Sequence, residues 1–91
     1  MKQICLFTGG RSEYGIQRPL LKALEADRRI HTTLIVACEH LDYTRYGLAH
    51  VAERMRMILN ERKCDVVFLF PGGTRVVVTR RGNGCEKADM P

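Results

Sequence analysis

Three short apolar runs alternate with two amphipathic segments along the first seventy residues. The runs cover residues 2–8, 32–37 and 65–70, and their β-branched and apolar side chains predict buried strands. Apolar residues recur at intervals of three and four in residues 16–24 and 48–62, which predicts a helix in each segment. The order strand–helix–strand–helix–strand predicts an α/β fold with a Rossmann-like parallel sheet and right-handed crossovers.

A parallel sheet is normally covered on both faces. We therefore expect the strand order two-one-three, because it places the two helices on opposite faces of the sheet. The strand at residues 32–37 would then be an unpaired edge, so we expect marginal stability or self-association through that edge.

The apolar pattern is lost after Phe70. A Pro71–Gly73 turn leads to Val76–Val78, which could add a short antiparallel strand, and the basic end that follows has no periodicity. The sequence therefore predicts a Rossmann-like domain over residues 1–70 and an irregular or partly disordered tail over residues 71–91.

Composition narrows the class of protein. The chain is 45% hydrophobic and 27% charged, as in ordinary globular proteins, and its net charge of +5 suits an anionic ligand. The basic residues do not interleave with aromatic ones, so we expect no specific nucleic-acid partner. The four cysteines are widely spaced with no C-x-x-C pair, and we expect reduced thiols and no metal site. Without a signal peptide or a run of ~18 apolar residues, we expect a cytoplasmic protein with no membrane partner.

The most informative feature is the turn at Gly9–Gly10, where the first strand leads into the first helix. This arrangement directs backbone N–H groups toward an anion such as a phosphate. The turn matches neither a Walker A loop nor the G-x-G-x-x-G pattern. It is either a phosphate site, with Arg11 as a bidentate ligand, or a tight turn with a solvated arginine. Glu39 and Asp42 beside His40 suit either an acid–base group or a hydrogen-bonded polar loop.

Longer stretches of the chain resemble one family. Residues 7–28 resemble the opening of the hydrolysing UDP-N-acetylglucosamine 2-epimerases, whose first strand runs into a T-G-x-R-[AS]-[ED]-Y turn. Glu39–Leu41, followed by Tyr46–Gly47, resembles that family's G-x-H-L element and Y-G pair. Residues 48–70 resemble a later helix and the strand that precedes a Gly-Asp-Arg motif.

The resemblance implies a fold, a reaction and a site. The fold would be the incomplete N-terminal half of a glycosyltransferase-B arrangement. The reaction, in amino-sugar biosynthesis, would convert UDP-N-acetylglucosamine to N-acetylmannosamine and UDP without a metal or redox cofactor. Gly10, Arg11, Ser12 and Glu13 would hold UDP or a UDP-N-acetylhexosamine, and His40 would lie near the sugar.

The chain also departs from the family. The family's third strand is missing between Gly47 and Leu48, and Pro71–Arg75 stands where the acidic Gly-Asp-Arg motif belongs. The second domain and most catalytic residues are lacking, as a truncation or a reading-frame slip would produce. We therefore assign no catalytic residue and predict a chain that is inactive alone. The alternatives are a non-catalytic nucleotide-binding α/β module and a gene fragment without function.

Overall fold

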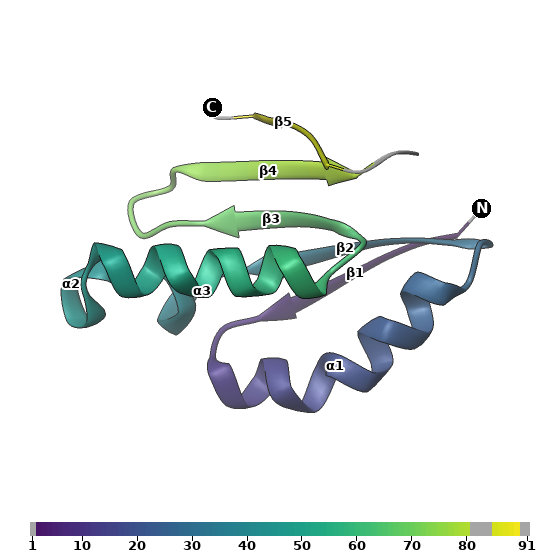
Figure 1. Ribbon diagram of the computed structural model, residues 1–91, viewed down its shortest axis with the longest axis horizontal. Coiled ribbons are helices and arrows are strands. Elements are labelled where there is room, and N and C mark those ends of the chain that lie inside the picture. Colours follow the sequence, from purple (N-terminus) through teal and green to yellow (C-terminus); the bar gives the residue numbers. More distant parts are fainter. Residues whose placement is uncertain (1, 81–84, 90–91) are drawn as a thin grey trace.

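The computed structural model of the chain describes residues 2–80 and 85–89. They form a five-stranded mixed sheet with helices packed against it (Figure 1). The elements in chain order are β1 (Lys2–Thr8), α1 (Arg11–Ala26), β2 (Ile30–Val36), the 3-10 helix η1 (Cys38–Leu41), α2 (Tyr43–Tyr46), α3 (Leu48–Glu61), β3 (Asp65–Leu69), β4 (Arg75–Arg80) and β5 (Cys85–Asp89). The predicted α/β class is confirmed, and the three parallel strands with their helices are compatible with a Rossmann-like fold.

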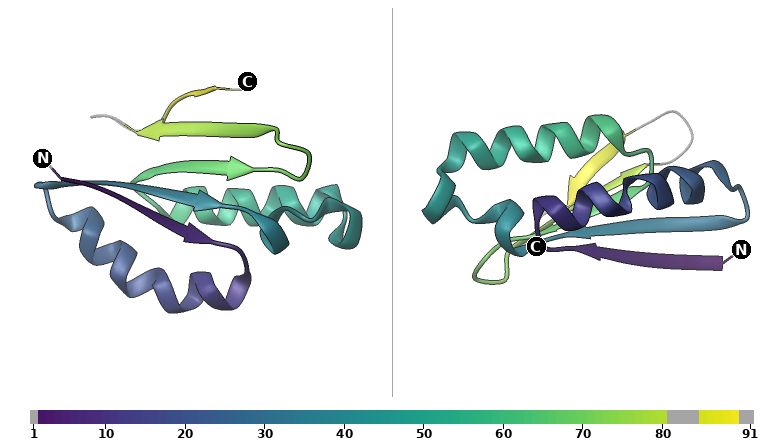
Figure 2. Two further views of the ribbon diagram at one scale, coloured as in Figure 1. Left: turned by 180° about the vertical axis from the view of Figure 1, so that it is seen from behind. Right: turned by 90° about the horizontal axis from the view of Figure 1, so that it is seen from below.

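The strands follow one another across the sheet in chain order, β1-β2-β3-β4-β5. Strands β1 to β3 are parallel, and β4 and β5 continue the sheet antiparallel. The expected order two-one-three is therefore wrong: β2 lies between β1 and β3, and the edges of the sheet are β1 and β5. Two crossovers of the same hand that step in the same direction place their helices on the same face. Figure 2 shows α1 and α3 together on one side of the sheet.

The core lies between this covered face and the two helices. Leu34 of β2, Phe68 of β3 and Ile58 of α3 are fully buried there. On β1, burial alternates along the strand, so that Thr8 is fully buried while Phe7 is 47% exposed. The expectation of a fully buried first strand is therefore wrong, because no helix among the described residues covers the second face.

Helix α1 begins at Arg11, directly after the glycine pair, and not near Gly15 as the apolar pattern predicts. Pro19 consequently lies in the helix interior. Its missing N–H leaves the Gly15 carbonyl without its usual helical partner. Both residues are exposed, so water can satisfy that carbonyl. Among the described residues, no helix is long and apolar enough to cross a membrane.

The segment that follows β3 joins the sheet. Gly72 and Gly73 in the connecting turn have φ angles of +91° and +97°, a region that favours glycine. The next strand pairs antiparallel with β3, which confirms the short strand predicted at Val76–Val78. Strands β4 and β5 thus replace much of the irregular tail expected over residues 71–91. The remainder of that tail, residues 81–84, 90 and 91, lies outside the described residues.

Candidate functional site

The turn between β1 and α1 is fixed by both backbone groups of Gly9. Its N–H donates to Glu13 Oε1 at 3.0 Å, and its carbonyl accepts from the Glu39 N–H at 2.8 Å. A Cβ atom on Gly9 would lie 3.1 Å from Glu13 Oε1 and 3.3 Å from the Phe7 ring. Glycine therefore fits this position because the chain and the Glu13 side chain approach it so closely.

The first turn of α1 has unused hydrogen-bond donors. Gly10 is the N-cap residue, and no side chain caps the helix there. The Tyr14 N–H bonds the Gly10 carbonyl at 3.0 Å, but the N–H groups of Arg11, Ser12 and Glu13 find no acceptor among the described residues. Free N–H groups and the helix dipole together favour an anion at this end of α1.

His40 lies beneath this turn, at the carboxyl end of β1. Its side chain is 2% exposed, and its Nε2 lies 2.9 Å from Thr8 Oγ1. The Thr8 hydroxyl donates to the Gly10 carbonyl at 3.2 Å, so it accepts the bond from His40 Nε2–H. Burial lowers the pKa of His40, and the nearby Arg54 guanidinium lowers it further. Both effects favour the neutral imidazole, and its bond to Thr8 links η1 to the turn.

The Nδ1 atom of His40 is left as a lone-pair acceptor. This atom is buried and has no partner among the described residues. A group that is sealed from solvent cannot take a proton from a ligand in the present arrangement. The geometry gives His40 a role in positioning the turn.

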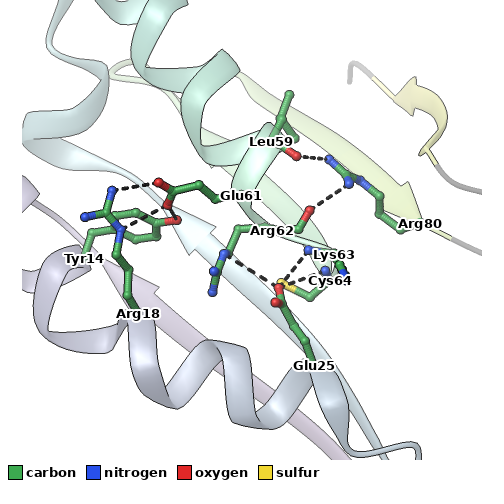
Figure 3. A network of polar contacts seen from close by, with 9 residues as sticks. All are labelled: Tyr14, Arg18, Glu25, Leu59, Glu61, Arg62, Lys63, Cys64 and Arg80. Carbon is green, nitrogen blue, oxygen red and sulfur yellow. Dashed lines mark hydrogen bonds and ion pairs between the residues drawn. The ribbon is translucent and has the colours of Figure 1, made fainter.

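Tyr14 connects this turn to helix α3. Its ring lies edge-on to His40 with centroids 6.2 Å apart, and its hydroxyl donates to Glu61 Oε1 at 2.7 Å. Arg18 binds both carboxylate oxygens of Glu61 at 3.0 Å, and its guanidinium lies 4.9 Å from the Tyr14 ring centroid (Figure 3). Burial, followed by the hydrogen bond to Glu61, raises the pKa of Tyr14 to about 12. The two long helices are thus tied together directly behind the turn.

The polar stretch that follows β2, where the sequence pattern predicts a loop, folds into η1 and α2. Asp42 caps α2, accepting from the Arg45 N–H at 3.2 Å and from Thr44 Oγ1 at 2.7 Å. The Thr44 hydroxyl and the neighbouring backbone lower the pKa of Asp42. This use of Asp42 favours the hydrogen-bonded polar loop over the acid–base group.

An open cavity of about 560 Å³ adjoins the turn. The residues lining it are Gly9, Cys38, Glu39, Asp42, Thr44, Arg45 and Pro71. Its charged groups are two carboxylates and one guanidinium. The Glu39 carboxylate comes within 3.8 Å of the position that a Cβ atom would take on Gly10. A negative charge therefore already stands close to the start of α1.

The structure places all five predicted site residues at this turn. Gly10, Arg11, Ser12 and Glu13 form the turn and the first turn of the helix, and the last three are exposed. His40 lies below them, with its side chain buried. Thr8 joins the site without having been singled out from the sequence. The signal for it was a polar residue at the end of an apolar strand, immediately before the glycine pair.

Among the described side chains, no group of three or more His, Cys, Asp or Glu residues could hold a metal ion. No protein-family model, curated protein or solved structure matches the chain.

Proposed function

We propose that the chain binds the diphosphate of UDP, or of a UDP-N-acetylhexosamine, at the start of α1. The observation that carries the proposal is the set of three unpaired N–H groups at Arg11, Ser12 and Glu13, next to a helix N-cap that has no side-chain acceptor. The exposed Arg11 and Ser12 side chains add a cation and a hydroxyl beside those groups. The choice of UDP comes from the resemblance to the hydrolysing epimerases.

The charges near the turn set the expected strength of binding. Glu13 is occupied by the Gly9 N–H, whereas the exposed Glu39 carboxylate would repel a diphosphate. Arg11 and the net charge of +5 act in the opposite direction. Because these charges oppose each other, we expect the chain to bind UDP weakly.

On this view the chain holds half of a UDP-sugar site and does not convert the sugar nucleotide. Such a half-site would correspond to the N-terminal half of a glycosyltransferase-B arrangement, with the sugar facing a second domain. The burial of His40 Nδ1 supports this view, because it leaves no histidine positioned to move a proton at the turn. We therefore expect no release of UDP when the pure chain is incubated with UDP-N-acetylglucosamine.

The test is a ¹⁵N–¹H spectrum of the chain recorded during titration with UDP. We expect chemical-shift changes centred on residues 9–14. Arg11→Ala should weaken binding several-fold, whereas Arg28→Ala should leave it unchanged. Arg28 is an equally exposed arginine that lies just beyond the far end of α1, so it controls for the loss of one positive charge.

Two further ligands make the result specific. Uridine lacks the phosphates, and we expect it to leave the amide signals of residues 9–14 in place. ADP tests the alternative of a general nucleotide-binding module, since it carries the same diphosphate on a different base. Equal shifts with ADP and UDP would favour that alternative, and no shift with either would refute an anion site at this turn.

A further inference from the structure

The outer side of β1 is an unpaired strand edge (Figure 1). The Lys2 N–H bonds the Arg29 carbonyl, and the Thr8 carbonyl accepts from the Ala37 N–H, so the even-numbered residues direct their backbone groups toward β2. The odd-numbered residues, Gln3, Cys5 and Phe7, therefore direct theirs outward. The Gln17 side chain agrees with this direction, because it donates to the Phe7 carbonyl at 2.8 Å and so takes the place of a bond from β2.

Apart from the Gln17 bond to the Phe7 carbonyl, the strand carries none of the usual features that prevent strand addition. Residues 2–8 contain no proline, pair with β2 without a register shift, and carry one charged side chain, Lys2, at the end of the strand. Natural proteins protect edge strands with prolines, bulges or central charges. An unprotected strand of seven residues is a ready template for pairing with another strand.

We infer that two copies of the chain associate by antiparallel pairing of β1 with β1, with the two-fold axis at Cys5. In this register all seven residues of the strand lie opposite one another, and Gln3 faces Phe7 of the second copy. Each of the three outward-directed residues can exchange both of its backbone hydrogen bonds there. Any other symmetric register leaves part of the strand unpaired.

The side chains also suit this register. Ile4 lies opposite Leu6 of the second copy, so two half-buried apolar side chains meet on the helix-covered face. Lys2 lies opposite Thr8, so like charges do not face each other. The Phe7 carbonyl keeps its bond to Gln17, because a carbonyl oxygen can accept two hydrogen bonds.

Helix α1 extends the contact. The Gln17 bond shows which side of α1 faces the β1 edge, and Leu20 and Leu24 follow on that side at helical spacing. Leu20 is 50% exposed and lies near the middle of the helix. The sixteen residues of α1 span about 24 Å and the seven of β1 about 23 Å, so Leu20 lies roughly level with Cys5. Two copies related by this axis would bring their α1 helices side by side.

Sedimentation equilibrium of the full chain in the presence of a reducing agent tests the inference. We expect a reversible dimer of twice the 10.4 kDa chain mass at micromolar concentrations. Cys5→Lys places two ammonium groups face to face on the axis and should weaken the dimer by about tenfold or more. Cys5→Thr, which is neutral and favourable in a strand, should leave it intact. Cys5 is exposed, so both variants should fold, and far-UV circular dichroism verifies this.

Two more measurements locate the contact. A short bis-maleimide should join Cys5 of one copy to Cys5 of the other, as identified by peptide mass spectrometry. Leu69→Lys places a charge on the open sheet face two strands away from β1, and it should leave the dimer unchanged. A chain that stays monomeric would overturn the inference. A dimer that resists Cys5→Lys or dissociates with Leu69→Lys would also overturn it, since the contact would then lie elsewhere.

Discussion

Glu25, near the end of α1, holds the segment between α3 and β3 in place (Figure 3). Its side chain is 7% exposed and accepts the N–H groups of Lys63 at 2.9 Å and Cys64 at 3.1 Å. The same carboxylate oxygen lies 3.7 Å from Nε of Arg62, whose side chain is also 7% exposed. We predict that Glu25→Ala causes a larger loss of stability than any surface substitution in the chain.

The magnitude follows from what the substitution leaves behind. The partly buried Cys64 N–H would lose its acceptor at a cost of about 1–3 kcal/mol, whereas the exposed Lys63 N–H can turn to water. The Arg62 guanidinium would remain buried without its carboxylate, and breaking a buried ion pair costs about 3–5 kcal/mol. These two penalties overlap, so we expect a decrease of about 4 kcal/mol in the free energy of unfolding. A domain of this length has roughly 5–14 kcal/mol in total.

Urea denaturation followed by circular dichroism measures this change. Glu25→Gln keeps one carbonyl acceptor for the two N–H groups but removes the charge, so we expect an intermediate loss. Glu53→Ala is the matched control. Glu53 lies on α3 with a side chain that is 79% exposed, and its ion pair with Arg56 at 3.6 Å should contribute little.

The double variant Glu25→Ala/Arg62→Leu tests the assigned cause. If the unpaired guanidinium accounts for much of the loss, replacing it with an apolar side chain should recover about 1 kcal/mol or more relative to Glu25→Ala. A loss below about 1 kcal/mol for Glu25→Ala would refute the reasoning. A double variant that is no more stable than the single one would show that the lost N–H contacts dominate.

Three other measurements follow from the site and its surroundings. Folded His40 holds its proton less tightly than the unfolded chain does, so stability should fall as the pH drops below the ordinary pKa of 6.5. His40→Gln should flatten this dependence in urea denaturation, and the exposed His50→Gln should not. Glu39→Gln should strengthen UDP binding roughly threefold by calorimetry, because it removes a negative charge near the start of α1; unchanged affinity would place the diphosphate elsewhere. Burial, and then Glu25, raise the pKa of Cys64 to about 12, so a disulfide reagent at mildly alkaline pH should modify exposed Cys5 quickly and Cys64 only on unfolding. Equal rates would contradict the burial of Cys64.

The local pattern of the sequence was enough to predict most of the elements. The helix predicted over residues 48–62 is α3, and the three predicted strands are β1, β2 and β3. Apolar spacing reports these elements because a strand or helix must direct its own apolar side chains to one side. The start of α1 was placed late, because its first turn is polar and carries no apolar spacing.

The strand order could not be predicted in the same way. Both orders use the same strands and helices, and they differ only in the direction of one crossover. Parallel sheets are usually covered by helices on both faces, and order two-one-three is the one that provides this cover. In the structure, β3 lies between β2 and β4, and a hairpin joins β3 to β4. Each strand therefore lies beside the one that precedes it in the chain.

The candidate site was predicted in part for a similar reason. The glycine turn lies within a few residues of sequence, so its position at the start of a helix is a local property. The bond between Thr8 and His40 joins residues 32 positions apart and exists because β1 and β2 are neighbours in register. Its prediction requires the strand order, which the sequence pattern did not contain.

The one-sided packing of the helices explains why polar contacts matter so much for this chain. The open face of the sheet carries one row of apolar side chains across four strands: Phe7, Ile35, Val67 and Val77. Because no helix covers this row among the described residues, these side chains bury less apolar surface than they would beneath a helix. The covered face must therefore supply most of the hydrophobic stabilisation. Tyr14, near the start of α1, bonds Glu61 at the end of α3, and Glu25, near the end of α1, accepts from the segment that follows α3. A sheet with helices on both faces would have a second core to retain its fold after the loss of one such contact. The described residues of this chain form a single core, so the chain should unfold when that core is lost.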